Sequence, residues 1–144
     1  MSRRGRLQFP SVDASTDPAR HAEYLALVAS VIGGLRAEAL PGLDLHPGAR
    51  LLDAGCGLGE YAIEVAPRVL PDGRVVGVDA SHELVERARQ ANEAAGSSVE
   101  FQVGDIRALQ FADGSFDTVR CERVLQHLTP ADAATAVTEQ PLPR

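Results

Sequence analysis

The segment at residues 51–59 reads Leu-Leu-Asp-Ala-Gly-Cys-Gly-Leu-Gly, and it constrains the fold more than any other part of the chain. It begins as an apolar strand, reaches an acid at Asp53 and continues into glycines at alternate positions. Glycine lets the backbone approach a ligand that side chains would keep away. A second apolar run over residues 75–78 ends in another acid, Asp79. A glycine turn followed by an acid on the neighbouring strand is how nucleotide-binding α/β folds hold an adenosine ribose.

The spacing of these glycines argues against a dinucleotide. A GxGxxG pattern would place its third glycine at position 60, which is Glu60, whereas Gly55, Gly57 and Gly59 form GxGxG. A diphosphate favours backbone amides without negative neighbours, and Asp53 and Glu60 would repel it. A ligand with an ammonium and a sulfonium would find the same acids attractive. A nicotinamide-dependent dehydrogenase is therefore disfavoured.

With these features the chain resembles the class I S-adenosylmethionine-dependent methyltransferases. Four segments carry the resemblance, in the family's order: residues 51–59, 75–81, 104–106 and 116–119. Together they span roughly residues 48–128. The resemblance implies an α/β fold with a Rossmann-like parallel sheet, flanking helices and the strand order 3-2-1-4. It also implies S-adenosylmethionine as cofactor and a methyl acceptor as substrate.

Apolar and turn residues predict strands that alternate with helices, as a parallel sheet requires. Strands are expected near residues 50–54, 74–78, 99–103 and 116–121. Helices are expected over about 58–66, broken by Pro67, then from a cap at Ser81 to Gly96, and from Thr129 to before Pro141.

The first part of the chain has a different character. Residues 1–16 are polar without periodicity, and we expect a disordered or extended segment ahead of a domain at residues 17–144. Asp17 and Pro18 are typical of a helix start, and Pro41 ends the helix they begin. In the family a leading helix often covers the cofactor, so Tyr24 is either a lid residue or a residue packed on the sheet.

The expected sheet is incomplete. The family carries seven strands and this chain has signals for four. Where a fifth strand normally follows, residues 139–144 read Glu-Gln-Pro-Leu-Pro-Arg. The strand at 116–121 would then lie at an exposed edge. We expect a marginally stable chain, or self-association through that edge.

The resemblance assigns cofactor contacts at the ends of the first two strands. Asp53 would meet the ammonium through water, or cap the following helix. Gly55 and Gly57 would allow close approach, and Gly59 would serve helix packing more than contact. Asp79 would accept hydrogen bonds from both ribose hydroxyls.

Further contacts are implied at the ends of the next strands. Ala80 would lie against the adenine. The Asp105 carboxylate would receive the adenine amino group, or else brace its loop, and the Ile106 amide would meet a ring nitrogen. Cys121 and its neighbour Glu122 would touch the methionine portion.

A catalytic residue is harder to assign. His127 is a weak candidate for a base, because a neutral imidazole is available near pH 7. The alternative is a histidine that ties its loop to the sheet. Many methyl transfers need little acid–base assistance, since the sulfonium is already activated.

Composition and charge disfavour several other classes of function. The net charge of −6 disfavours a nucleic-acid partner. No apolar run approaches the roughly 20 residues of a membrane span, and no secretory signal is evident, so we expect a cytoplasmic protein. Cys56 and Cys121 form neither a disulfide framework nor a zinc site, and no metal cluster is visible. The simplest interpretation of both cysteines is that they are small buried residues beside the cofactor, without a chemical role.

Two hypotheses follow for the function. The first is a methyltransferase that acts on a small molecule by in-line transfer from the sulfonium. The second is a truncated remnant that binds the cofactor without turnover. The missing strands separate them, because the later part of this fold supplies much of the acceptor site.

Overall fold

The computed structural model describes residues 17, 19–20, 23, 43, 45–122, 124 and 128–133. A helix follows each of the first two strands, as predicted, whereas the segment between the third and fourth strands contains no helix. In chain order the helices and strands are β1 (Arg50–Ala54), α2 (Glu60–Val69), β2 (Arg74–Asp79), α3 (His82–Ala94), β3 (Glu100–Val103) and β4 (Thr118–Arg120). β4 is shorter than the predicted strand at 116–121.

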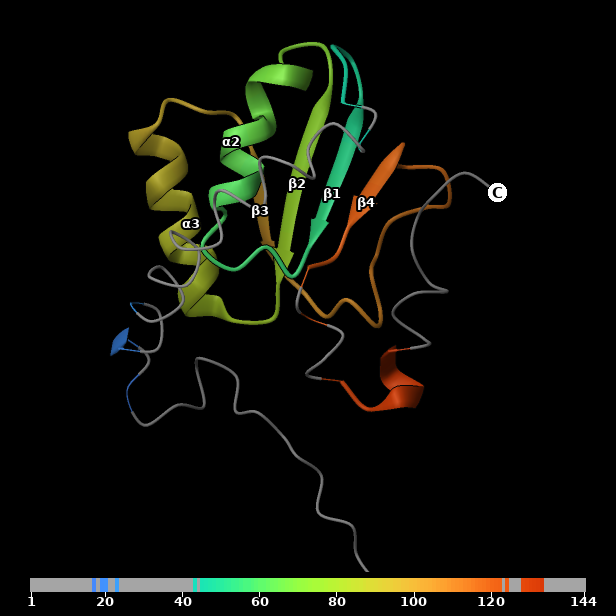
Figure 1. Ribbon diagram of the computed structural model, residues 1–144. Coiled ribbons are helices and arrows are strands. Elements are labelled where there is room, and N and C mark those ends of the chain that lie inside the picture. The colour runs from blue at the N-terminus through green and yellow to red at the C-terminus, as the bar shows by residue number, and fades with distance from the viewer. Residues whose placement is uncertain are drawn as a thin grey trace, which may run out of the picture.

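The four strands form one parallel sheet in the order β3-β2-β1-β4 (Figure 1). This confirms the predicted Rossmann-like order. Because the strands are parallel, their carboxyl ends meet at one edge of the sheet, the lower edge in Figure 1. Asp53, near the end of β1, is opposite Gly77 of β2 on one side and Arg120 of β4 on the other.

Each face of the sheet carries its own apolar cluster. Helices α2 and α3 cover one face (Figure 1), and the cluster there joins Leu51 and Val75 to Val65 of α2 and Val85 of α3. The other face packs against the segments after β3, through buried residues: Leu52, Ala54, Val76, Val78, Ile106 and Phe116. Strands buried on both faces explain why β1 and β2 read as continuous apolar runs.

Helix α2 corrects one prediction. The expected break at Pro67 is wrong, because the helix continues through Pro67 to Val69. Proline removes one backbone donor from the helix, and that loss falls on the exposed side of the last turn. The turn is held by the fully buried Val69 and by the bond from Leu70 N to Ala66 O at 2.9 Å. Burial of the last turn therefore outweighs the lost hydrogen bond.

Helix α3 begins and ends where its caps predict. The Ser81 hydroxyl accepts a hydrogen bond from Leu84 N at 3.1 Å, which satisfies one of the unpaired amides at the helix start. Gly96 follows the helix with φ of 61°, the left-handed conformation that terminates helices.

Ion pairs tie the amino ends of neighbouring strands together. Arg50 at the start of β1 donates to Asp117 just ahead of β4, with Nη2 to Oδ1 at 2.6 Å. Arg74 at the start of β2 pairs with Glu100 at the start of β3, at 2.8 Å. The Arg50 guanidinium lowers the pKa of Asp117 to about 2 by hydrogen bonding. Asp117 thus aligns β4 with β1 at the edge opposite the glycine turn.

Several predictions lie outside the described residues: the segment 1–16, most of the leading helix with Tyr24, and the end of the last helix. Residues 130–133 are helical, and Ala133 N donates to Thr129 O at 2.8 Å. No helix within the described part of the chain is long and apolar enough to cross a lipid bilayer.

Candidate cofactor-binding site

The glycine turn after β1 is fastened to the end of β2. The amides of Gly55 and Cys56 both donate to Val78 O, at 2.7 and 2.9 Å. Gly55, Gly57 and Gly59 have φ of 79°, 57° and 75°, a region that other residues rarely adopt. The alternate glycines are therefore required by the shape of the turn itself.

The three glycines face different surroundings. A Cβ built on Gly59 would lie 2.5 Å from Phe101 Cζ and 2.9 Å from Ala88 Cβ, so Gly59 lets α2 approach α3 and β3. A Cβ on Gly55 would collide with the Val124 side chain. A Cβ on Gly57 would meet no described atom within 4 Å. Gly57 therefore borders the open space at the strand ends.

Asp79 links the glycine turn to β2 and α3. Its Oδ2 accepts from Gly57 N at 3.0 Å and its Oδ1 accepts from Ser81 N at 2.9 Å. Its carbonyl also accepts from Gly104 N after β3, at 2.9 Å. A carboxylate offers about four acceptor positions, so this bracing is compatible with binding to ribose hydroxyls. The adjacent Ala80 is exposed.

In the loop after β3, Asp105 and Ile106 make contacts within the protein that differ from the expected adenine contacts. The Asp105 carboxylate accepts from the backbone amide of Arg107 at 2.9 Å and pairs with its guanidinium. This hydrogen bonding lowers the pKa of Asp105. Ile106 is 6% exposed and belongs to the apolar cluster on the face away from the helices. In this structure Asp105 has the loop-bracing geometry, and the adenine contact stays a prediction.

A charged cluster at the ends of β1 and β4 was missed by the sequence analysis. Arg120 Nη1 donates to Asp53 Oδ1 at 2.9 Å, and Arg120 Nη2 pairs with Glu122. The Arg120 guanidinium carbon lies 3.8 Å from the centroid of the Tyr61 ring. Asp53 is only 1% exposed. The available signal was an arginine inside a strand, at a position in register with a buried acid.

Similarity to known proteins identifies the family of this chain. Residues 51–140 match the model of a family described as a methyltransferase domain. The chain belongs to the class I S-adenosylmethionine-dependent methyltransferases.

Two proteins show the extent of the similarity in sequence and in structure. An uncharacterised 37.1 kDa protein of transposon Tn4556 from Streptomyces fradiae is 47% identical over 100 residues, which are 69% of this chain and 28% of that protein. The crystal structure of protein PH0226 from Pyrococcus horikoshii has a TM-score of 0.71 at 29% identity, over 81% of this chain and 53% of the other.

A third relative carries a bound cofactor product. Magnesium protoporphyrin IX methyltransferase from Synechocystis, solved with S-adenosylhomocysteine, has a TM-score of 0.56 at 31% identity. That match covers 84% of this chain and 50% of the enzyme. The methyltransferase chain therefore spans well under two thirds of the length of these relatives.

The two cysteines of this methyltransferase chain lie on different faces of the sheet. Cys56 contacts the apolar cluster under α2 and α3, whereas Cys121 contacts the opposite cluster. Both thiols are free. Burial raises the pKa of each thiol, and the Asp53 carboxylate raises both further. Both therefore stay protonated near neutral pH, as expected of small residues packed beside a site.

His127, the candidate base, lies outside the described residues. Those residues contain no group of three or more histidine, cysteine, aspartate or glutamate side chains that could hold a metal ion.

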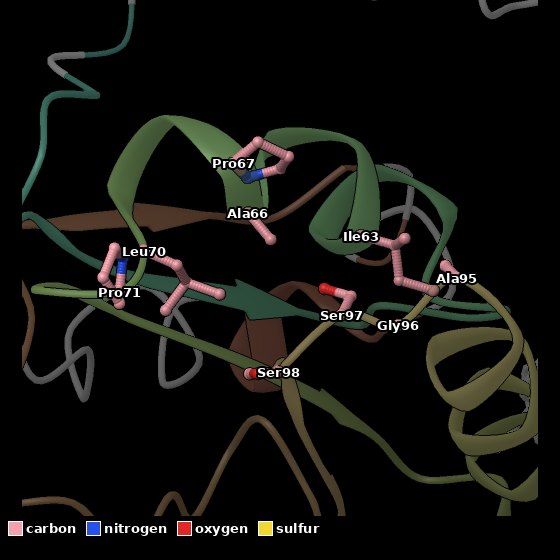
Figure 2. A pocket seen from close by; sticks show the side chains of 9 residues that line it. All are labelled: Ile63, Ala66, Pro67, Leu70, Pro71, Ala95, Gly96, Ser97 and Ser98. Atoms are coloured by element: carbon pink, nitrogen blue, oxygen red, sulfur yellow. The ribbon is translucent and has the colours of Figure 1, made fainter.

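A hollow of about 440 Å³ lies at the wrong edge of the methyltransferase sheet for the cofactor (Figure 2). The hollow is lined on one side by the last turn of α2 and by Pro71. On the other side it is lined by Ser97 and Ser98 in the segment after α3. These segments lead into the amino ends of β2 and β3, away from Gly57 and Asp79.

Proposed function

We propose that this chain binds S-adenosylmethionine at the carboxyl ends of β1 and β2, for in-line methyl transfer to a small molecule. The observation that carries the proposal is the 3.0 Å hydrogen bond between Gly57 N and Asp79 Oδ2. It brings the glycine that borders open space and the acid at the end of β2 to a single point.

The residues at this edge fit the parts of the cofactor. Asp79 would hold the ribose hydroxyls, because its carboxylate is fixed by two backbone amides and only half-buried. Ala80 and the Ile106 amide would flank the adenine. Asp53 and the segment at Cys121 would meet the methionine portion. Such fixed acceptors need little reorganisation when the ligand arrives.

Charge favours a cationic ligand over a pyrophosphate. Asp53, Asp79 and Glu122 all lie at this edge, and Arg120 pairs with Asp53 and Glu122. A diphosphate would have to approach several carboxylates, whereas a sulfonium would be attracted to them.

When bound, the cofactor supplies a methyl group already activated for displacement. The protein's part is to hold the cofactor so that the acceptor can approach in line with that methyl group. The Asp79 brace and the positive-φ turn serve this by fixing the backbone around the ligand. His127 as a base remains part of the proposal.

The acceptor class is supported by relatives such as the Synechocystis enzyme, whose name states that it methylates a porphyrin. A second candidate function is binding without turnover. The matched part is 28% of the Streptomyces protein and 53% of the Pyrococcus chain, so turnover by this chain is not carried over from a whole relative. Methyl transfer to an acceptor would separate the two candidates.

The test is a calorimetric titration with S-adenosylhomocysteine. Asp79→Asn should weaken binding by about 10- to 100-fold, the value of one charged hydrogen bond. Asp72→Asn is the matched control, because Asp72 is exposed in the turn before β2. Thermal melting of both variants checks that they fold, since Asp79 also braces the turn. A folded Asp79→Asn protein with unchanged affinity would exclude the ribose assignment.

A further inference from the structure

Arg107 supplies all the hydrogen bonds of the Asp105 carboxylate within the described part of the chain. Its backbone amide donates to Oδ1 at 2.9 Å, and its Nε lies 2.9 Å from Oδ1 and 3.0 Å from Oδ2. Its Nη2 also donates to Oδ2. A carboxylate offers about four acceptor positions. The acid expected to receive the adenine amino group is therefore largely occupied by a charged donor of the same loop.

The Arg107 guanidinium also faces a second acid, Asp132. Arg107 Nη1 lies 3.7 Å from Asp132 Oδ2, which is an ion pair longer than a hydrogen bond. Asp132 belongs to the short helix at residues 130–133 that follows β4, whereas Arg107 belongs to the loop after β3. Both segments lie at the carboxyl edge of the sheet (Figure 1). Arg107 therefore bridges two segments at the edge of the proposed cofactor site.

The Asp132 carboxylate is held in place at the start of its helix. Thr129 Oγ1 donates to Asp132 Oδ2 at 2.8 Å, and Asp132 N donates to Thr129 Oγ1 at 3.2 Å. A shift of about 1 Å would bring Arg107 Nη1 to the length of a charge-assisted hydrogen bond. Asp132 is therefore a second, preformed position for the guanidinium.

The two ion pairs of Arg107 are similarly hydrated. The side chains of Asp105, Arg107 and Asp132 are 43%, 42% and 40% exposed. Exposed ion pairs contribute little to stability, because water competes for both charges. A guanidinium that moves from Asp105 to Asp132 exchanges one exposed pair for another. A ligand therefore needs only a modest binding free energy to displace the guanidinium from Asp105.

We propose that Arg107 is a two-position latch that controls adenine recognition. In the free protein its guanidinium occupies Asp105, and it moves fully to Asp132 when the adenine amino group donates to Asp105. This inference rests on the proposed function and adds a regulation of the same site. The move strengthens the link between the loop after β3 and the helix after β4, so that the bound cofactor draws these segments together. Arg107 acts through Asp105 and is a positioning residue.

Calorimetric titrations with two ligands test the latch. S-adenosylhomocysteine carries the purine amino group, and S-inosylhomocysteine carries an oxygen in its place. Arg107→Met frees Asp105, so it should bind the adenosyl ligand about 2- to 5-fold more tightly than the wild type, without this gain for the inosyl ligand. Asp132→Asn removes the second position, so it should bind the adenosyl ligand about 2- to 5-fold more weakly. A residue that only braces its loop would not give changes of opposite sign.

A double variant and a surface arginine serve as controls. Because Asp132 acts only through Arg107, adding Asp132→Asn to Arg107→Met should change affinity by less than about 1.5-fold. Arg87→Met removes an exposed arginine that pairs with Glu83 on α3, and it should leave both affinities unchanged. Asp132→Asn keeps an oxygen that accepts from Thr129. Thermal melting checks that each variant folds.

An Arg107→Met protein that binds S-adenosylhomocysteine more weakly than the wild type would overturn the inference, because Arg107 would then orient Asp105 rather than compete for it. Equal affinity of Arg107→Met for the adenosyl and inosyl ligands would also overturn it, since Asp105 would then not recognise the amino group. In both cases adenosyl binding persists in the wild type and the proposed function stands. If the wild type binds neither ligand, the proposed function itself fails.

Discussion

Gly59 meets two separate requirements at one residue. Its φ of 75° starts α2 in a left-handed conformation, and its missing Cβ leaves space for Phe101 and Ala88. Gly96 also has a positive φ, of 61°, but a Cβ there would meet no described atom within 4 Å. Alanine substitutions at these two glycines therefore separate the free-energy cost of backbone strain from the cost of overpacking.

We expect Gly59→Ala to lower the free energy of unfolding by about 2 to 5 kcal/mol, from left-handed strain plus overpacking. Gly96→Ala should cost about 1 to 2 kcal/mol, from strain alone. Urea denaturation of both variants measures the difference. Equal losses would mean that Phe101 and Ala88 move aside and that contact with α3 does not require a glycine.

Sequence reasoning located single residues well wherever local chemistry decides their conformation. The glycine turn, the Ser81 cap and the position of Asp79 at the end of β2 follow from residue type and spacing. Arg120 and Tyr61 could not be located in this way. Their contact with Asp53 depends on the register between β1 and β4, strands that are more than 60 residues apart in the chain.

At the scale of elements, the strand order was predictable and the exact ends were not. Apolar runs bounded by turns indicate β1, β2 and β3, and the family resemblance orders them. The length of α2 depends on whether Val69 finds a buried place, which tertiary packing decides. The expectation that a proline ends a helix considers only the hydrogen bonds of the helix itself. For this reason the predicted end of α2 at Pro67 came too early.

The pairing of β4 with β1 predicts a pH dependence. Arg50 lowers the pKa of Asp117 to about 2, below its ordinary value of 3.8. A lowered carboxylate pKa contributes stability above the unfolded pKa, and that contribution disappears as pH falls through the folded value. The melting temperature of the wild type should therefore exceed that of Asp117→Asn at pH 7. The gap should close between about pH 4 and pH 2.

Other carboxylates also protonate in this range, including Glu100, whose pKa is lowered by Arg74. The difference between wild type and Asp117→Asn at each pH removes their common effect. A gap that stays constant from pH 7 to pH 2 would show that Asp117 is not held ionised by Arg50.

At the scale of the whole molecule, the four-stranded sheet ends at β4, which pairs with β1 alone among the described residues. An edge strand presents backbone donors and acceptors to any partner strand. We expect the chain to self-associate as its concentration rises, with sedimentation equilibrium giving a mass above 15.2 kDa. A single species of monomer mass across the concentration range would contradict this expectation.

The central claim is spatial: the adenosyl ligand binds at the carboxyl ends of β1 and β2. An NMR titration of the ¹⁵N-labelled chain with S-adenosylhomocysteine tests it most directly, through the backbone amides. We predict saturable shifts at Gly57, Ser81 and Gly104, with Gly96 and Ser97 at the opposite edge unchanged. Shifts centred on Gly96 and Ser97, or none at Gly57 under saturating ligand, would contradict the account.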